Sequence, residues 1–319
     1  MEAVDKAESE FGQRTALIIA GPTASGKSAL ALALAEAYGG TIINADAMQC
    51  YQELRVVTAR PSVADEARVP HRLYGVCTAA EPANAAWWRR AAQNEMERAS
   101  VPILCGGTGM YFSALVNGIA DIPDPGAVAR AKARADLAEI GPEALYARLD
   151  RETAAKLKPQ DSQRIARAYE VLIGTGQGLA YWQVRSKSGL QGWRIKLILL
   201  DPPRPALRTA IETRFDQMLE AGAIEEVSAL LARNLSPDLP LLRAYGVPEL
   251  AAYLRGEITL AEASARAVLA SFQYTKRQMT WFRHQKLVND TDMKIIHSQN
   301  VKNTKFLESI IVEYRNFIK

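Results

Sequence analysis

Residues 16–40 read ALIIAGPTASGKSALALALAEAYGG, a stretch that predicts a strand, a phosphate-binding loop and a helix in that order. Residues 21–28, GPTASGKS, fit the pattern G-x-x-x-x-G-K-[ST]. The two glycines let successive backbone N–H groups converge on phosphate oxygens, and the N-terminus of the helix adds its dipole. Lys27 adds a positive charge and Ser28 a hydroxyl for Mg²⁺. The stretch therefore predicts a bound polyphosphate and its magnesium ion, held by Gly21, Pro22, Thr23, Ala24, Ser25, Gly26, Lys27 and Ser28.

The same order of elements recurs along the first third of the chain. TIINAD, residues 41–46, is a short apolar strand that ends in polar residues, and 101–119 repeat the strand, glycine-rich turn and helix. This alternation predicts an α/β fold: a parallel sheet core, as in phosphate-loop (P-loop) NTPases, with helices on its faces. Ligands of such sheets bind beyond the carboxyl ends of the strands. We therefore expect the loop 21–28, Asp46 and residues 106–108 at one edge.

The composition of the sequence changes near residue 121, where DIPDPG interrupts the alternation of strands and helices. An Ala-, Arg- and Glu-rich stretch follows, with no clear strand before RIKLILLD at 194–201. It predicts a helical insertion domain within the α/β core. The expected divisions are an N-terminal tail (1–14), the first part of the core (15–120), the insertion (121–192), a mostly helical completion of the core (193–286) and a C-terminal tail with a packed helix (287–319).

Composition places the 319-residue chain among ordinary soluble globular proteins, with 48% hydrophobic residues and a net charge of +4. It has no apolar run of eighteen residues, and its first residues are charged, so we expect a cytoplasmic protein without a membrane span. The mild positive charge is compatible with a polyanionic partner without requiring one. Three cysteines scattered singly predict small buried thiols, and three distant histidines predict no metal site.

The phosphate-binding loop alone leaves open whether the ligand is ATP. An ATP-using enzyme normally adds a carboxylate at the end of a neighbouring strand to hold the metal ion. The strand within VPILCGGT, residues 101–108, ends without one, whereas RIKLILLD ends in Asp201. We interpret Asp201 as the N-cap of the helix that follows, with metal binding as the alternative. Asp46, directly after the second strand, is the stronger carboxylate candidate.

Nine blocks in order carry a resemblance to a known family. They are GPTASGKS, NADAMQCY, TARPS, VPHRLYGV, ILCGGTGMYF, DSQRIARAYEV, RFDQMLEAG, AYGVPEL with YLRGEITLAEA, and YTKRQMTWFR. Together, over about residues 15 to 285, they resemble the tRNA dimethylallyltransferase (tRNA isopentenyltransferase) family. The chain has no Cys/His module near its C-terminus, which favours the bacterial type. A kinase would share the first block and lack the rest.

The resemblance implies that the loop holds dimethylallyl diphosphate, and that the acceptor is the exocyclic amine of the adenosine 3′ to a tRNA anticodon. An adenine amine is a poor nucleophile, so a carboxylate that removes its proton would serve as general base, and Asp46 is the candidate. Thr108 matches a polar residue near both substrates, and Arg214 matches a diphosphate-binding arginine. Here the chain departs from the expected pattern, because Ala210 stands where the family commonly has arginine. If that arginine is essential, Arg208 or Arg204 must compensate.

The family likeness also implies which residues contact tRNA: Asp46, Ala47, Met48, Gln49, Thr108, Gln163, Arg164, Ile165, Ala166, Arg167, Lys276 and Arg277. Arg164 and Arg167 lie one helical turn apart, a spacing that suits backbone phosphates. Trp281 and Phe282 are expected in the core. The preferred substrates would be tRNAs that read codons beginning with U, and a monomer is expected. Two rivals stay open: an ATP-dependent small-molecule or nucleotide kinase, and a P-loop RNA-binding protein without chemistry.

Overall fold

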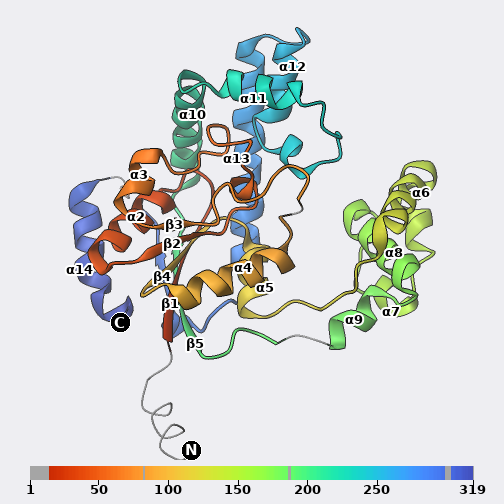
Figure 1. The fold of residues 1–319 in the computed structure, drawn as a ribbon, viewed down its shortest axis with the longest axis horizontal. Coiled ribbons are helices and arrows are strands. Elements are labelled where there is room, and N and C mark those ends of the chain that lie inside the picture. Colours follow the sequence, from red (N-terminus) through yellow and green to blue (C-terminus); the bar gives the residue numbers. More distant parts are fainter. Residues whose placement is uncertain (1–13, 82, 186–187, 299–302, 319) are drawn as a thin grey trace, which may run out of the picture. The chain divides into compact units, whose positions relative to one another are not determined.

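The computed structural model describes residues 14–81, 83–185, 188–298 and 303–318, and contains a six-stranded parallel sheet (Figure 1). The strand order is β3-β2-β4-β1-β5-β6. The strands are β1 (Arg14–Ala20), β2 (Thr41–Asn44), β3 (His71–Arg72), β4 (Pro102–Gly106), β5 (Trp193–Leu200) and β6 (Met293–Ile296). The predicted α/β class with a parallel sheet is therefore confirmed.

Two strands and one boundary differ from the sequence-based expectation. Strand β6 lies inside the segment 287–319, for which we expected only a tail and a helix, and β3 is too short to give a periodic signal. Residues 1–13 of the expected N-terminal tail lie outside the described residues, and Arg14 already begins β1. Both strands are edge strands of the sheet. They form because they pair with the adjacent strand, and their own sequence pattern is too short to predict them.

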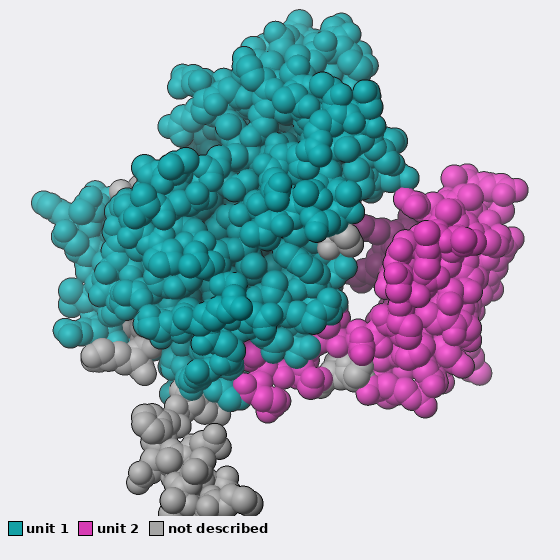
Figure 2. All heavy atoms as spheres, in the orientation of Figure 1, with its two compact units in different colours: residues 1–116, 192–319 teal, residues 117–191 magenta. Residues whose placement is uncertain are grey.

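The chain forms two compact units, of which the larger comprises residues 1–116 and 192–319 (Figure 2). Helices flank the sheet in this unit (Figure 1). They are α2 (Lys27–Tyr38), α3 (Val63–Arg68), α4 (Ala85–Arg98), α5 (Gly109–Val116), α10 (Arg204–Glu220), α11 (Ala223–Ala232), α12 (Val247–Leu254), α13 (Leu260–His284) and α14 (Thr304–Ile318). Short 3-10 helices are η1 (Met48–Cys50), η2 (Pro240–Arg243) and η3 (Asp290–Asp292). Helix α2 ends as expected at Gly39, whose left-handed φ of 65° suits glycine.

The core on one face of the sheet is built around α2. Leu17 and Ile19 of β1 pack with Leu30 and Leu34 of this helix, because alternate strand residues point to the same face. Helix α14 adds Ile310 to the same cluster, and the Tyr38 hydroxyl donates a hydrogen bond of 2.8 Å to the carbonyl of Ile311. The expected packed terminal helix is thus present.

The second unit, residues 117–191, has helices and connecting loops but no strand among its described residues. It consists of α6 (Gly126–Tyr146), α7 (Arg151–Ala154), α8 (Ser162–Thr175) and α9 (Leu179–Arg185). Helix α6 bends at Gly141, whose φ is 76°, directly before Pro142. Its core joins Ala133 and Leu145 of α6 to Ile165 and Tyr169 of α8. The unit's bounds lie close to the predicted 121–192.

None of the helices in the described residues combines the length and apolar character that a membrane span requires. Cys50, Cys77 and Cys105 are all buried free thiols, as predicted. Burial raises the pKa of the Cys77 and Cys105 thiols to about 11, so both stay protonated and unreactive at neutral pH.

Candidate active site

Parallel pairing brings three loops to the same edge of the sheet. Ala20 at the end of β1 pairs in register with Gly106 of β4, and Asn44 of β2 pairs with Cys105. The chain therefore leaves these neighbouring strands at one level, as ligand sites on parallel sheets require. The phosphate-binding loop, Asp46 and Thr108 follow these strand ends, where the sequence placed them.

The phosphate-binding loop has the tight geometry that its glycines predict. A Cβ at Gly21 would lie 2.6 Å from the Leu200 carbonyl oxygen, so only glycine fits against β5. Gly26 has a φ of 91° and stands directly before α2. The Ser25 amide donates to the Pro22 carbonyl at 3.3 Å, and the Lys27 ammonium donates to the same oxygen at 2.6 Å. The loop is thus curled with its lysine folded across it.

Lys27 carries a charge that burial makes costly. Desolvation lowers the pKa of Lys27 to about 8, an effect that nearby Cys105 and Asp46 oppose and that Arg214 reinforces. The ammonium is still protonated at neutral pH, and a bound diphosphate would supply the opposite charge that it lacks. Ser28, one residue further, is exposed at the start of α2, where a hydroxyl can reach a phosphate-bound Mg²⁺.

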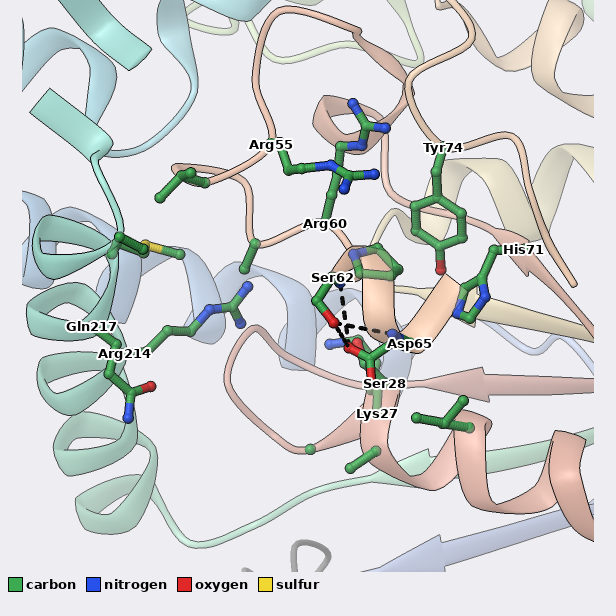
Figure 3. Close-up of a pocket in the computed structure, with 18 of the residues that line it drawn as sticks. Lys27, Ser28, Arg55, Arg60, Ser62, Asp65, His71, Tyr74, Arg214 and Gln217 are labelled. Carbon is green, nitrogen blue, oxygen red and sulfur yellow. Dashed lines mark hydrogen bonds between the residues drawn. The ribbon is translucent and has the colours of Figure 1, made fainter. Parts of the chain in front are cut away.

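A cavity of about 850 Å³ opens beside this loop (Figure 3). Its basic lining residues are Lys27, Arg55, Arg60, Arg68 and Arg214, and its apolar ones include Leu32, Ile42, Val56 and Met218. Arg55 pairs with Glu66 at 2.7 Å, and Arg68 pairs with Glu36 at 2.7 Å. Within the described residues, the other three cations form no ion pair. The cavity therefore combines unneutralised positive charge with an apolar wall, as an allylic diphosphate requires.

Arg214 reaches the phosphate-binding loop from α10. Its guanidinium donates to the Thr23 hydroxyl oxygen at 3.4 Å and to the Thr58 carbonyl at 3.5 Å. Burial lowers the pKa of Arg214, and the nearby Asp46 carboxylate opposes that shift. The group is thus a desolvated cation directed at the site where a phosphate would lie (Figure 3).

Arg204 and Arg208, the alternative candidates for diphosphate binding, lie away from the cavity. Arg204 and Arg208 stack over the Phe272 ring at 4.5 and 5.9 Å, and Arg208 bonds Glu212 at 3.0 Å. Neither lines the cavity, whereas Ala210, at the position where the chain departs from the family pattern, does. The geometry therefore favours Arg214 over both alternatives.

Asp46 is held by its neighbours on both sides. The Asp46 amide donates to Asn44 Oδ1 at 2.8 Å, and the Met48 amide donates to Asp46 Oδ1 at 3.0 Å. Thr108 fixes the flanking residues: its amide donates to the Ala45 carbonyl at 3.1 Å, and its hydroxyl oxygen accepts from the Ala47 amide at 3.1 Å. Among the described residues, Oδ2 of Asp46 accepts no hydrogen bond. One carboxylate oxygen is therefore anchored and the other is available.

Asp46 and Thr108 do not line the large cavity, so the carboxylate and the basic cavity are neighbouring but separate features. Gln49, the last residue of the expected acceptor segment, donates through Nε2 to the Thr58 and Ala59 carbonyls at 2.8 and 3.0 Å. It thereby ties the segment after Asp46 to the loop that carries Arg60. Ala47 and Met48 are half-buried.

The expected tRNA-binding residues of α8 occupy two environments. Gln163, Arg164 and Arg167 are exposed, and the two arginines pair with their sequence neighbours Asp161 and Glu170. Ala166 is half-buried. Ile165 has no exposed surface and belongs to the core of the helical unit, so its side chain supports the helix instead of facing a ligand.

On α13, Lys276 and Arg277 are exposed, and the Arg277 guanidinium donates to the Tyr245 hydroxyl. Phe282 is buried as expected, and Trp281 is half-buried, its ring so close to Gly109 that a Cβ there would lie 2.1 Å away. The basic residues of YTKRQMTWFR therefore face solvent while its aromatic residues pack inward.

The interpretation of Asp201 as a helix cap is wrong. Helix α10 begins after Pro203, with no side-chain cap, because the proline pair carries the chain past the aspartate. Oδ2 of Asp201 instead accepts a hydrogen bond from Arg283 at 3.3 Å. The structure groups no three His, Cys, Asp or Glu side chains around a potential metal site within the described residues.

Sequence reasoning singled out neither the cavity residues of the loop 55–62 nor Gln278. Arg55, Arg60, His71 and Tyr74 line the cavity, and Gln278 contacts the loops after β1 and β4. The blocks TARPS, VPHRLYGV and YTKRQMTWFR contain four of these five residues and were the available signal. Their roles depend on contacts between segments far apart in the chain, which no local pattern encodes.

Comparison with known proteins decides the family. The model of the IPP transferase family matches residues 49–285, and that of isopentenyl transferases matches residues 14–78. A tRNA dimethylallyltransferase from Acidiphilium cryptum is 60% identical, covering 96% of this chain and 95% of the relative. The chain belongs to the tRNA dimethylallyltransferase family. A relative of the same name from Gluconobacter oxydans is 57% identical, covering 96% of this chain and 94% of its own.

Solved structures agree with this family assignment. The tRNA isopentenylpyrophosphate transferase of Bacillus halodurans superposes with a TM-score of 0.67 at 28% identity, covering 96% of this chain and 97% of that one. A eukaryotic dimethylallyltransferase acting on tRNA, at 24% identity, shares the fold with a TM-score of 0.77 over 95% of this chain and 79% of that one. The chain therefore has the P-loop NTPase-like fold that we expected from the sequence. It is an enzyme of the transferase class.

Proposed function

We propose that the enzyme transfers a dimethylallyl group from dimethylallyl diphosphate to the exocyclic amine of adenosine 37, 3′-adjacent to the anticodon, and releases diphosphate. The substrates would be tRNAs that read codons beginning with U. The names of the relatives support this proposal. The observation that carries it is that Asp46 lies close enough to the half-buried Lys27 and Arg214 to oppose the lowering of the pKa of both. A base for the acceptor thus lies within range of the groups that hold the donor.

On the donor side, the protein stabilises a leaving group. The allylic carbon can carry developing positive charge, so most of the barrier lies in the charge that collects on the departing diphosphate. Lys27, Arg214 and the loop amides would neutralise it in a desolvated site, where such contacts are stronger than in water. The apolar wall of the cavity suits the prenyl carbons.

Magnesium fits this donor site through few protein ligands. Mg²⁺ is usually bound by one or two protein oxygens together with substrate phosphates and water. The exposed Ser28 hydroxyl at the start of α2 is the one protein ligand that we assign. The ion would supply further positive charge to the diphosphate.

On the acceptor side, the carbon–nitrogen bond forms as the carbon–oxygen bond to diphosphate breaks. The diphosphate leaves with the electron pair, and the amine proton passes to Asp46 Oδ2, the oxygen without a hydrogen bond from the described residues. Oδ1 stays bound to the Met48 amide, which fixes the carboxylate during the transfer. Thr108 holds the backbone on both sides of the base, and its hydroxyl, which donates no hydrogen bond to the residues that the structure describes, would contact a substrate.

The tRNA would be bound by exposed basic side chains and one exposed amide side chain on α8 and α13. Gln163, Arg164 and Arg167 lie on α8, and Lys276 and Arg277 lie on α13. Such side chains contact phosphates and give orientation rather than sequence recognition. The anticodon loop is single-stranded, so its adenosine can be extruded towards Ala47, Met48 and Gln49 at modest cost.

Incubation of the enzyme with labelled dimethylallyl diphosphate, unmodified tRNA and Mg²⁺ tests the proposal. We expect the label in tRNA at adenosine 37, and none in tRNA that carries guanosine there. ATP turnover without labelled tRNA would support the kinase, and tRNA binding without transfer would support the RNA-binding protein. The kinase is not favoured, because Asp201, the carboxylate after β5, is bonded to Arg283.

A further inference from the structure

Gln278 joins the two halves of the candidate site. This residue of α13 is 5% exposed. Its burial is explained by hydrogen bonds to both the oxygen and the nitrogen of its amide. Its Oε1 accepts a hydrogen bond from the Thr23 amide at 3.0 Å, and its Nε2 donates to the Gly107 carbonyl at 3.1 Å. One planar amide thus connects the phosphate-binding loop after β1 to the turn after β4.

Gly107 is shaped around this amide. A Cβ at Gly107 would lie 2.2 Å from Nε2 of Gln278 and 3.2 Å from the Gly21 carbonyl oxygen. Any larger residue would push the amide away from the carbonyl to which it donates. The glycine in CGGTG therefore makes room for the side chain of a residue 171 positions later.

Each end of the link continues to a residue proposed for the chemistry. On the donor side, Thr23 is bound by its amide to Gln278 and by its hydroxyl oxygen to Arg214 at 3.4 Å. On the acceptor side, Gly107 precedes Thr108, which binds both neighbours of Asp46. Gln278 is thus a buried side chain that ties the loop contacted by the diphosphate-binding arginine to the turn that holds the base.

We propose that Gln278 is a positioning residue that sets the separation between the donor diphosphate and the acceptor carboxylate. This inference rests on the proposed transfer reaction. Reacting atoms must approach to about 3–3.5 Å, and a misplacement of about 1 Å can cost roughly a hundredfold in rate. Gln278 contacts neither reacting atom, so its effect is on geometry.

The chemistry of an amide makes the role testable. Glutamine offers N–H donors and a carbonyl acceptor in the same plane, as the Gly107 carbonyl and the Thr23 amide require. In Gln278→Glu, the ionised carboxylate can still accept from Thr23 but repels the Gly107 carbonyl. The protonated acid can again donate. Because burial raises the pKa of a carboxyl group, that protonation is expected near neutral pH. In Gln278→Met, neither bond can form at any pH.

The experiment measures kcat at saturating tRNA and donor, and KM for each, between pH 6 and 8. We expect kcat of both variants to fall by about ten- to a hundredfold at pH 8, with KM values within about threefold of wild type. The ratio of Gln278→Glu to wild-type kcat should rise about tenfold as pH falls, and that of Gln278→Met should stay flat. Gln273→Glu, an exposed glutamine on the same helix, adds the same charge and should keep a constant ratio near one.

Four results would overturn the positioning role. They are kcat values near wild type for both variants, an equal pH response of Gln278→Glu and Gln278→Met, an effect confined to KM, and failure of both variants to fold as judged by thermal unfolding. The last would assign Gln278 to folding alone. Failure of the proposed function is distinct, because wild-type enzyme would then transfer no label either.

Discussion

The arginines of the two compact units differ in what surrounds them. Arg214 of the α/β unit is desolvated, has no carboxylate within bonding distance among the described residues, and is directed at the phosphate-binding loop. Arg164 of the helical unit is exposed and pairs with Asp161 one turn away at 3.3 Å. A buried cation is costly unless a ligand neutralises it, whereas an exposed pair contributes about 0–1 kcal/mol. The first environment suits chemistry on a diphosphate, and the second suits additive contacts to a polyanion.

The largest effect is expected at Asp46. Asp46→Asn should lower kcat by about 10²–10⁴-fold, because the amide cannot take the proton from the amine, while tRNA binding stays near wild type. The asparagine side chain still offers an oxygen to the Met48 amide, so the loop should keep its conformation. Single-turnover transfer of label and a tRNA filter-binding assay measure the two effects. Turnover near wild type would remove Asp46 from the role of base.

The second-largest effect is expected for a substitution of Arg214. Arg214→Gln should raise KM for dimethylallyl diphosphate by about 10–100-fold, since the variant cannot form a charge-assisted bond to the phosphate in a desolvated site. The matched control is Arg208→Gln, on the same helix but paired with Glu212, which should change KM less than about twofold. Steady-state kinetics with varied donor decide between them. A large effect at Arg208 with none at Arg214 would reverse the assignment.

Lys27 should make donor binding depend on pH. Its pKa of about 8 means that the free enzyme holds the charge below pH 8 and loses it above. Bound diphosphate favours the charged form, so KM for the donor should be constant below pH 8 and rise above it by at most about tenfold per pH unit. KM for tRNA, measured from about pH 7 to about pH 9 in parallel, should stay flat. A donor KM that is constant to about pH 9 would contradict a depressed pKa.

The smallest effects are expected on α8. Gln substitutions of Arg164 or Arg167 should each raise KM for tRNA only a few-fold. They should also make the slope of log K against log salt concentration less steep by about one for each phosphate that the variant no longer neutralises. Lys substitutions retain the charge and should stay near wild type. Binding measured from about 50 to 200 mM salt provides the slopes. An unchanged slope in the Gln variants would remove these arginines from the tRNA-binding surface.

Local sequence pattern was sufficient where a structural requirement is local. The loop 21–28, the end of α2 at Gly39 and the carboxylate after β2 all follow from glycine conformations and strand ends. It failed at β3 and β6, whose pairing depends on neighbouring strands, and at Asp201, where two prolines displaced the helix start. The family resemblance assigns the whole segment 163–167 to tRNA binding and does not separate the core face of α8 from the exposed one, on which the buried Ile165 does not lie.

By itself the sequence determined that this protein has a phosphate-binding loop on a parallel sheet, a carboxylate after the next strand along the chain and the ordered blocks of its family. Only the tertiary structure decided which arginine reaches the loop, because Arg204, Arg208 and Arg214 share one helix and differ in the face they occupy. It also decided that Gln278 joins Thr23 to Gly107. Hydrogen bonds between such distant residues are specified by packing, and packing depends on all segments at once.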